Sequence, residues 1–180
     1  LLENNFVQVA FQFANDSLYF FKNGQRIQAI EASGNGGLAT STSPIVIGNG
    51  YEGMIDECRI WNNAKSDLEV NQGHSRIMVG GEPGLKAYLR FNEGTGKWAY
   101  DISKIGNAFN KNHAEFLGNP TWSETIPTSS QLSIASYTDV NGNYVMSVPY
   151  NGLGEGFVLT PSYLIHEFDP GTRALFIGDG

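Results

Sequence analysis

The carboxylates of one short segment are the first residues with types and spacing that could do chemistry. Asp56 and Glu57 are adjacent, and Glu52 lies four positions before Asp56. Retaining hydrolysis of a glycosidic bond needs two carboxyl groups about 5–5.5 Å apart that face one substrate. In a strand, adjacent side chains point to opposite faces, so Asp56 and Glu57 would not form such a pair. Glu52 shares the phase of Asp56 but lies beyond Gly53, which makes this pair the weaker interpretation.

A structural role for these residues is the stronger interpretation. The alternation over residues 51–61 predicts one long strand that carries Asp56 on one face and Glu57 with Arg59 on the other. We expect Asp56 to accept hydrogen bonds from the backbone or a loop at the inner edge. We expect Glu57 and Arg59 to form a same-face surface pair that contributes little stability. Ser66 and Glu69 then have the spacing of a capping box, which predicts a short helical turn.

Oxygen-bearing side chains in one loop indicate a candidate calcium site. They are Asp101, Ser103, Asn107 and Asn110. Carboxylate, hydroxyl and amide oxygens are the ligands that Ca²⁺ takes. Hydrogen bonds that only shape the loop are the alternative. We expect no required cofactor and keep calcium as a candidate.

Three large aromatic residues, Trp98, Tyr100 and Trp122, are candidates for stacking on the faces of sugar rings. Burial of the two Trp rings at the edge of a β-sandwich is the alternative, since large aromatic side chains are most often in cores. The histidines at 74, 113 and 166 lie in separate segments without zinc spacing, so we interpret them as surface or loop residues.

The composition excludes several classes of function. The 180 residues include 22 Gly, 11 Phe and 8 Tyr with only 16% charged residues, which suits short strands and tight turns. The net charge of −7 argues against a nucleic-acid partner, which would need a basic patch. No apolar run is long enough to insert in a membrane. Cys58 is the only cysteine and shares an apolar phase, so we interpret it as a small buried residue.

Several strands must position these side chains. Residues 18–30 predict a β-hairpin around Asn23-Gly24, and residues 45–48 predict a short buried strand. Residues 85–91 alternate Leu85, Ala87 and Leu89 with polar or aromatic neighbours, which predicts another strand. The apolar alternation over residues 6–13 requires further strand partners, so we expect the chain to be a piece of a larger protein whose first module lacks its N-terminal strands.

The segment from Gly53 to Trp61 resembles the laminin G-like, pentraxin-like branch of the concanavalin A-type jelly rolls. That branch carries a Gly-x-Ile-Asp-Glu-x-Arg-Ile-Trp strand before a Leu-Ser-x-x-Glu turn. Residues 85–96 are similar to its Leu-x-Ala-Tyr-x-Arg-Phe-x-Glu-Gly-x-Gly strand, and Asp101-Ile-Ser103 and Pro120-Thr-Trp122 follow as in the family. The loop over residues 107–113 departs from the compact loop of the family.

Residues 138–144 read Thr-Asp-Val-Asn-Gly-Asn-Tyr and resemble the hairpin of the carboxypeptidase regulatory-like fold, a small immunoglobulin-like β-sandwich. The two resemblances imply an all-β fold: an antiparallel jelly-roll sandwich over residues 1–127 and part of a small immunoglobulin-like β-sandwich over residues 128–180. The sandwich is expected to be partial, because about 100 residues make a full one.

The resemblance implies a non-catalytic binding or adhesion segment of a large, multidomain bacterial protein, secreted or at the cell surface, and not an enzyme. Its expected partners are a glycan or an extracellular protein ligand, together with neighbouring domains of the same chain. Two alternatives stay open. The segment is a structural stalk or filament piece without its own ligand, or it is a carbohydrate-targeting module of an enzyme encoded elsewhere.

Overall fold

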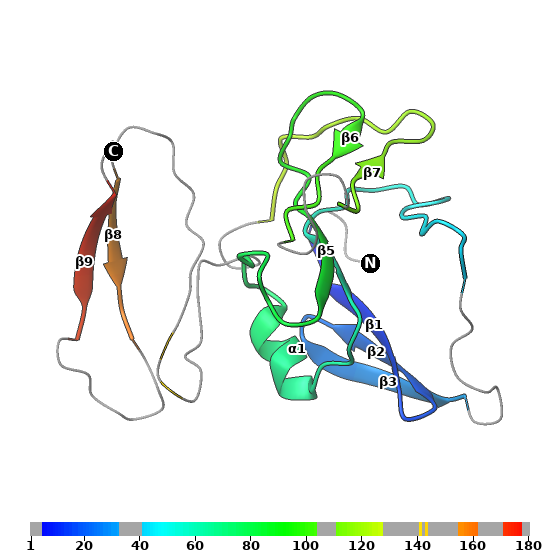
Figure 1. The fold of residues 1–180 in the computed structure, drawn as a ribbon, viewed down its shortest axis with the longest axis horizontal. Helices are drawn as coiled ribbons and strands as arrows, with labels where there is room; N and C mark the ends of the chain where they lie inside the picture. The colour runs from blue at the N-terminus through cyan, green and yellow to red at the C-terminus, as the bar shows by residue number, and fades with distance from the viewer. Residues whose placement is uncertain are drawn as a thin grey trace. The chain divides into compact units, whose positions relative to one another are not determined.

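The computed structural model describes residues 5–32, 41–103, 111–127, 141, 143, 155–161 and 171–177. The chain divides into two compact units, Leu1–Ser147 and Val148–Gly180. The described part is built of antiparallel strands with one short helix, which confirms the all-β prediction and agrees with a jelly-roll-like fold (Figure 1). The predicted boundary between residues 127 and 128 stays a prediction, because residues 128–140 lie outside the described part of the chain.

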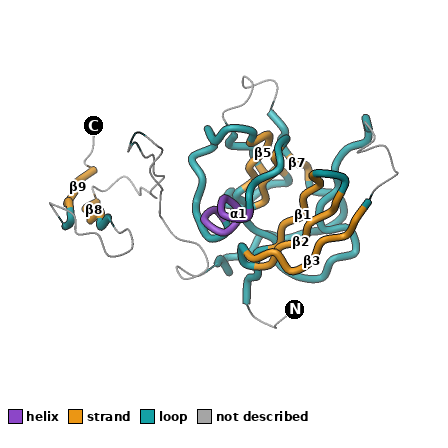
Figure 2. The backbone as a smooth tube through the Cα atoms, turned by 90° about the horizontal axis from the view of Figure 1, so that it is seen from below, coloured by secondary structure: helices purple, strands orange, loops and turns teal. Residues whose placement is uncertain are grey.

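Among the described residues of the first unit, the largest sheet has three antiparallel strands in the order β1 (Val9–Ala14), β2 (Ser17–Lys22) and β3 (Gln25–Glu31) (Figure 2). Asn23 and Gly24 join β2 to β3 with φ values of 46° and 75°. Positive φ at both central residues is the requirement of a type I′ turn, so the predicted hairpin is confirmed. The strand predicted over residues 6–13 is present as β1, but it begins only at Val9.

The two faces of this sheet differ in what covers them. Phe21 lies on one face and is only 2% exposed. Phe11 and Phe20 are cross-strand partners on the other face, with their ring centroids 5.5 Å apart in an edge-to-face arrangement. Phe11 is nevertheless 70% exposed. The sheet thus packs through the Phe21 face and leaves an apolar opposite face largely open.

The core of the unit lies around β4 (Cys58–Trp61) and β5 (Leu85–Leu89), an antiparallel pair in which Arg59 is opposite Tyr88. Met78, Leu85 and Tyr88 are buried and form the centre of this core. Tyr88 is buried as fully as the alternating apolar residues of β5, so both faces of this strand are covered.

Helix α1 (Asp67–Gly73) begins with the predicted capping box and lies against β3. The backbone N–H of Glu69 donates to the Ser66 hydroxyl at 3.2 Å, and the backbone N–H of Ser66 donates to the Glu69 carboxylate at 2.7 Å. Two N–H groups that the first helical turn leaves without partners are satisfied in this way. Helix α1, with seven residues, is too short to cross a membrane, and no other helix lies in the described residues.

Two predicted strands are wrong in extent or burial. The strand expected over residues 51–61 is limited to β4, because Glu57 has a φ of 53° and interrupts the extended backbone. Residues 45–48, expected as a buried strand, lie outside the strands, and Ile45 and Val46 are 70% and 61% exposed. Their β-branched composition favours a strand, but they have no strand partner within the described residues.

Two short ribbons complete the described strands. In the first unit, β6 (Trp98–Ala99) pairs with β7 (Ala114–Glu115). In the second unit, β8 (Glu155–Leu159) pairs with β9 (Arg173–Ile177), again antiparallel. The immunoglobulin-like resemblance stays a prediction, since only residues 141 and 143 of its hairpin motif lie in the described part.

Candidate functional site

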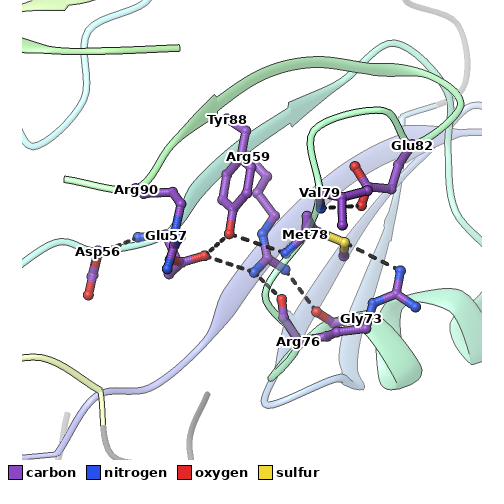
Figure 3. Close-up of polar contacts among 10 residues, drawn as sticks. All are labelled: Asp56, Glu57, Arg59, Gly73, Arg76, Met78, Val79, Glu82, Tyr88 and Arg90. Atoms are coloured by element: carbon purple, nitrogen blue, oxygen red, sulfur yellow. Dashed lines mark hydrogen bonds and ion pairs between the residues drawn. The ribbon is translucent and has the colours of Figure 1, made fainter. Parts of the chain in front are cut away.

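The left-handed backbone at Glu57 turns its carboxylate toward β5 (Figure 3). Its Oε2 accepts hydrogen bonds from Arg59 Nη2 at 3.2 Å and from the Tyr88 hydroxyl, and its Oε1 accepts from Arg90 Nε at 3.0 Å. The side chains of Glu57 and Arg59 are only 10% and 12% exposed. The prediction of a surface pair is therefore wrong, because Glu57 departs from strand alternation and is buried among three donors.

Arg59 extends this network beyond the two strands. Its Nη1 donates to the carbonyl of Gly73 at 2.8 Å and its Nη2 to the carbonyl of Arg76 at 2.5 Å. Its guanidinium carbon lies 5.2 Å from the centroid of the Tyr88 ring. The Arg59 guanidinium thus ties β4 to β5, to the last residue of α1 and to the segment that follows the helix. We call the side chains of Glu57, Arg59, Tyr88 and Arg90 the Glu57 network.

The protonation states of the network follow from burial. Desolvation, together with the charge of Glu57, raises the pKa of Tyr88 to about 12, so the hydroxyl keeps its proton and donates. Desolvation also raises the pKa of the half-buried Asp56 to about 6. One oxygen of Asp56 accepts from the backbone N–H of Glu57 at 2.8 Å, as expected for an inner-edge carboxylate. Glu57 itself has both oxygens committed to donors.

Asp101 organises the loop that carries the candidate calcium ligands. It is 4% exposed. Its Oδ1 accepts from the backbone N–H groups of Tyr88 and Ser103 at 3.0 and 2.8 Å, and its Oδ2 accepts from that of Asn112 at 3.1 Å. Burial acts to raise the pKa of Asp101, but these hydrogen bonds together outweigh it and hold the pKa below its usual value.

The calcium prediction stays untested. Ser103 is fully buried beside Asp101, and its hydroxyl donates to the carbonyl of Lys86 at 3.4 Å. Asn107 and Asn110 lie outside the described residues. Among the residues that the structure does describe, no group of three or more His, Cys, Asp or Glu side chains is placed to hold a metal ion.

The β6–β7 ribbon presents two of the three candidate aromatic residues. Ala99 is fully buried between Trp98 and Tyr100, so the alternation directs both rings to the opposite, outer side. Trp98 and Tyr100 are 39% and 51% exposed. Trp122 instead packs within the unit. Its indole N–H donates to the carbonyl of Gly96 at 2.8 Å, and the centroids of its ring and the Phe116 ring are 4.9 Å apart.

A residue that the sequence left as an unassigned loop histidine belongs to the same surface. The rings of His113 and Tyr100 lie edge to face with centroids 5.1 Å apart. Glu115, two positions after His113, is the strand partner of Trp98 and forms an ion pair with Lys97 at 2.6 Å. The i, i+2 spacing of His113 and Glu115 was visible in the sequence, but the register that places them beside the aromatic pair was not. We call Trp98, Tyr100, His113 and Glu115 the ribbon surface.

A shallow cleft of about 350 Å³ lies elsewhere in the first unit, between the β1–β2 turn and the segment that leads into α1. Its polar side chains largely bind one another. Arg26 pairs with Asp67 at 2.5 Å and lies 4.4 Å from the centroid of the Tyr19 ring, and Gln12 accepts from the backbone N–H of Lys65 at 3.1 Å. These contacts anchor α1 to the sheet and leave the ribbon surface as the better candidate for a ligand.

Comparison with known proteins bears on one part of the chain. No characterised protein and no solved structure matches the chain. Residues 1–71 match a laminin G family model described as the concanavalin A-like lectin/glucanases superfamily. The matched residues include β1 to β3, the Gly53–Trp61 motif and the start of α1, and they end before the ribbon surface. Over these residues the chain is therefore similar to a superfamily of lectins and glucanases, which suggests a binding module.

Proposed function

We propose that the chain is a non-catalytic binding module of a secreted or cell-surface protein, and that the ribbon surface binds glycans. One observation carries the proposal: Trp98 and Tyr100 present exposed rings on one side of a ribbon, next to the polar side chains of His113 and Glu115. The similarity of residues 1–71 to a superfamily that includes lectins supports the same class of function.

The chemistry of the ribbon surface suits a sugar. An aromatic ring offers a flat apolar face, and a sugar ring has an apolar face of C–H groups surrounded by hydroxyls. Binding sites generally combine such apolar area with a few placed polar groups that fix orientation. His113 and the Glu115–Lys97 pair are the polar groups available here.

The carboxylates support binding over hydrolysis. A nucleophilic carboxylate must face the substrate, whereas the Glu57 side chain is only 10% exposed and its oxygens face Arg59, Tyr88 and Arg90. Asp56 is bound to the backbone N–H of Glu57. A targeting module of an enzyme encoded elsewhere would carry the same ribbon surface, and it belongs to the same proposal at the level of this chain.

A structural role is the second candidate, and a separate observation favours it. The open face of the β1–β2–β3 sheet carries Val9, Phe11, Leu18 and Ile30, which are 55%, 70%, 36% and 43% exposed. Exposed apolar patches of this kind are typical of surfaces that pack against another element or domain. In a stalk segment this sheet face would be the functional surface and the ribbon surface would bind nothing.

A glycan array probed with the full chain, with and without EDTA, tests the proposal. We expect binding to a restricted set of glycans and its loss in the double variant Trp98→Ala/Tyr100→Ala. Phe11→Ala is the matched control, since it also removes an exposed aromatic side chain but from the other surface. Loss of binding with EDTA would support the calcium site. Absence of binding under both conditions, or binding that persists in the double variant, would contradict the proposal.

A further inference from the structure

We propose that His113 determines which sugars the ribbon surface accepts, by donating a hydrogen bond from Nε2–H to a ligand oxygen next to the Tyr100 ring. This inference rests on the proposed function and adds a specificity residue and a requirement on the ligand. The ligand must carry an acceptor oxygen, from a hydroxyl or the ring, beside the apolar face that stacks.

The hydrogen bond at the other nitrogen fixes the tautomer. The backbone N–H of Asp101 donates to Nδ1 of His113 at 2.9 Å, so Nδ1 has its lone pair free to accept and the neutral ring carries its proton on Nε2. Within the described part of the chain, Nε2 has no hydrogen-bond partner. A neutral imidazole with an occupied acceptor and an unoccupied donor can serve only as a donor to a ligand.

The ring is also held in place. Asp101, which supplies the bond to Nδ1, is itself fixed by the backbone N–H groups of Tyr88, Ser103 and Asn112. The Tyr100 ring lies against the imidazole at an interplanar angle of 85°. His113 is exposed despite these contacts. The donor is therefore preorganised at the edge of an accessible aromatic ring, which lowers the entropic cost of binding.

The surroundings favour a neutral polyhydroxyl ligand over a negatively charged one, because the Glu93 carboxylate accepts from the backbone N–H of Tyr100 at 2.7 Å and adds negative charge beside the ring. Lys97 and Glu115 neutralise each other at 2.6 Å on the Trp98 side, and Nζ of Lys97 lies 5.8 Å from the centroid of the Trp98 ring. No uncompensated charge is left among the side chains of the ribbon surface when His113 is neutral. A sugar hydroxyl accepts from Nε2–H without needing an opposite charge.

Two nearly isosteric variants separate ligand binding from loop structure. His113→Asn places an amide oxygen near the position of Nδ1, so it retains the acceptor for Asp101 but lacks the Nε2 donor. His113→Gln places an amide nitrogen near the position of Nε2, so it retains a donor but lacks the acceptor for Asp101. A residue with a merely structural role would show the larger loss of binding in His113→Gln, whereas a ligand donor shows it in His113→Asn.

The probes are the methyl glycosides of glucose, galactose, mannose and N-acetylglucosamine, titrated against the full chain by NMR. We expect His113→Asn to bind the preferred glycoside roughly 3- to 10-fold more weakly, as for loss of one hydrogen bond, with an unchanged thermal midpoint. His113→Gln should retain more affinity and have a lower midpoint.

The outcomes distinguish this inference from the proposed function. Unchanged affinity in His113→Asn, with binding lost in Trp98→Ala/Tyr100→Ala, would overturn the role of His113 and leave the glycan surface in place. Binding of equal strength to all four glycosides would also overturn it as a specificity residue. Failure of the unsubstituted chain to bind any of them, or binding that survives the aromatic double variant, would overturn the proposed function and this inference together.

Discussion

Replacing Glu57 by Gln is the sharpest test of the Glu57 network. The substitution keeps the shape of the side chain and removes its charge. One carboxylate oxygen becomes an NH₂ group, which must then face a donor, since Oε2 accepts from Arg59 and Tyr88 and Oε1 accepts from Arg90. The variant therefore loses two ionic interactions and forces at least one donor against another donor.

The expected loss of stability follows from burial. Breaking a fully buried ion pair costs about 3–5 kcal/mol, mostly through the charge left behind. Here Arg59 keeps the carbonyls of Gly73 and Arg76, and the Arg90 side chain is 27% exposed, so water takes up part of the lost interaction. We therefore expect Glu57→Gln to lower the free energy of unfolding by about 2–4 kcal/mol.

Urea unfolding followed by tryptophan fluorescence measures this loss. Trp61, Trp98 and Trp122 all lie in the first unit, so the signal reports on that unit. Tyr88→Phe removes one donor to Glu57, and a double-mutant cycle of the two substitutions isolates their coupling, which we expect to be about 1 kcal/mol. Glu115→Gln is the control, since its ion pair with Lys97 is exposed and should contribute no more than about 1 kcal/mol.

Two results would refute the reasoning. One is a loss of unfolding free energy in Glu57→Gln below about 1 kcal/mol, which is the size expected for an exposed pair. The slope of unfolding free energy against urea concentration must be unchanged for this comparison to hold. The other is a loss in the Glu115→Gln control as large as that in Glu57→Gln. Either outcome would mean that burial of the carboxylate among its three donors does not determine its contribution.

Three further substitutions have expected outcomes by the same urea assay. Asp56→Asn should raise stability at pH 7 by about 1–2 kcal/mol, after allowance for partial exposure. The pKa of Asp56 is raised to about 6, so the folded state binds the proton more tightly than the unfolded state. The unsubstituted chain therefore loses stability as the pH rises between about 4 and 6, and the gain in the variant vanishes near pH 4. An equal gain at pH 7 and pH 4 would contradict this. Asp101→Asn should lower the free energy of unfolding by about 2 kcal/mol at pH 7, because it places an NH₂ group against backbone donors. Since the pKa of Asp101 is lowered, this loss should shrink as the pH falls below about 4. A loss independent of pH would exclude the carboxylate charge as its cause. Ser66→Ala should cost about 1 kcal/mol through loss of the helix cap, and a change below about 0.3 kcal/mol would show that the cap is not needed.

Local signals in the sequence predicted local structure well. Asn23-Gly24 specifies a type I′ turn because both residues adopt positive φ readily, and the structure has it. Ser66 and Glu69 specify a capping box through groups only three residues apart, and both hydrogen bonds are present. In each case the interacting groups are neighbours in the chain, so no knowledge of the tertiary fold was needed.

Features that depend on distant partners were not predictable in this way. Strand periodicity over residues 51–61 assumes an extended backbone at every position, but Glu57 is left-handed and its carboxylate accepts from Tyr88 on β5 and from Arg90 just after β5. His113 could not be connected to Tyr100 without the register of β6 and β7. The exposure of Trp98 depended equally on which side of that ribbon is covered.

The positive φ of Glu57 also means that the Gly53–Trp61 motif cannot keep its conformation without residues from elsewhere in the chain. The residues that receive its carboxylate, Tyr88 and Arg90, lie 31 and 33 positions further along the chain. A peptide or a grafted loop that carried the motif alone would have an unpaired carboxylate and nothing to compensate for the strain of a left-handed Glu. Transplanting the motif into another scaffold would therefore require β5 and the Arg90 that follows it, so the smallest piece that keeps these contacts runs from Gly53 to Arg90.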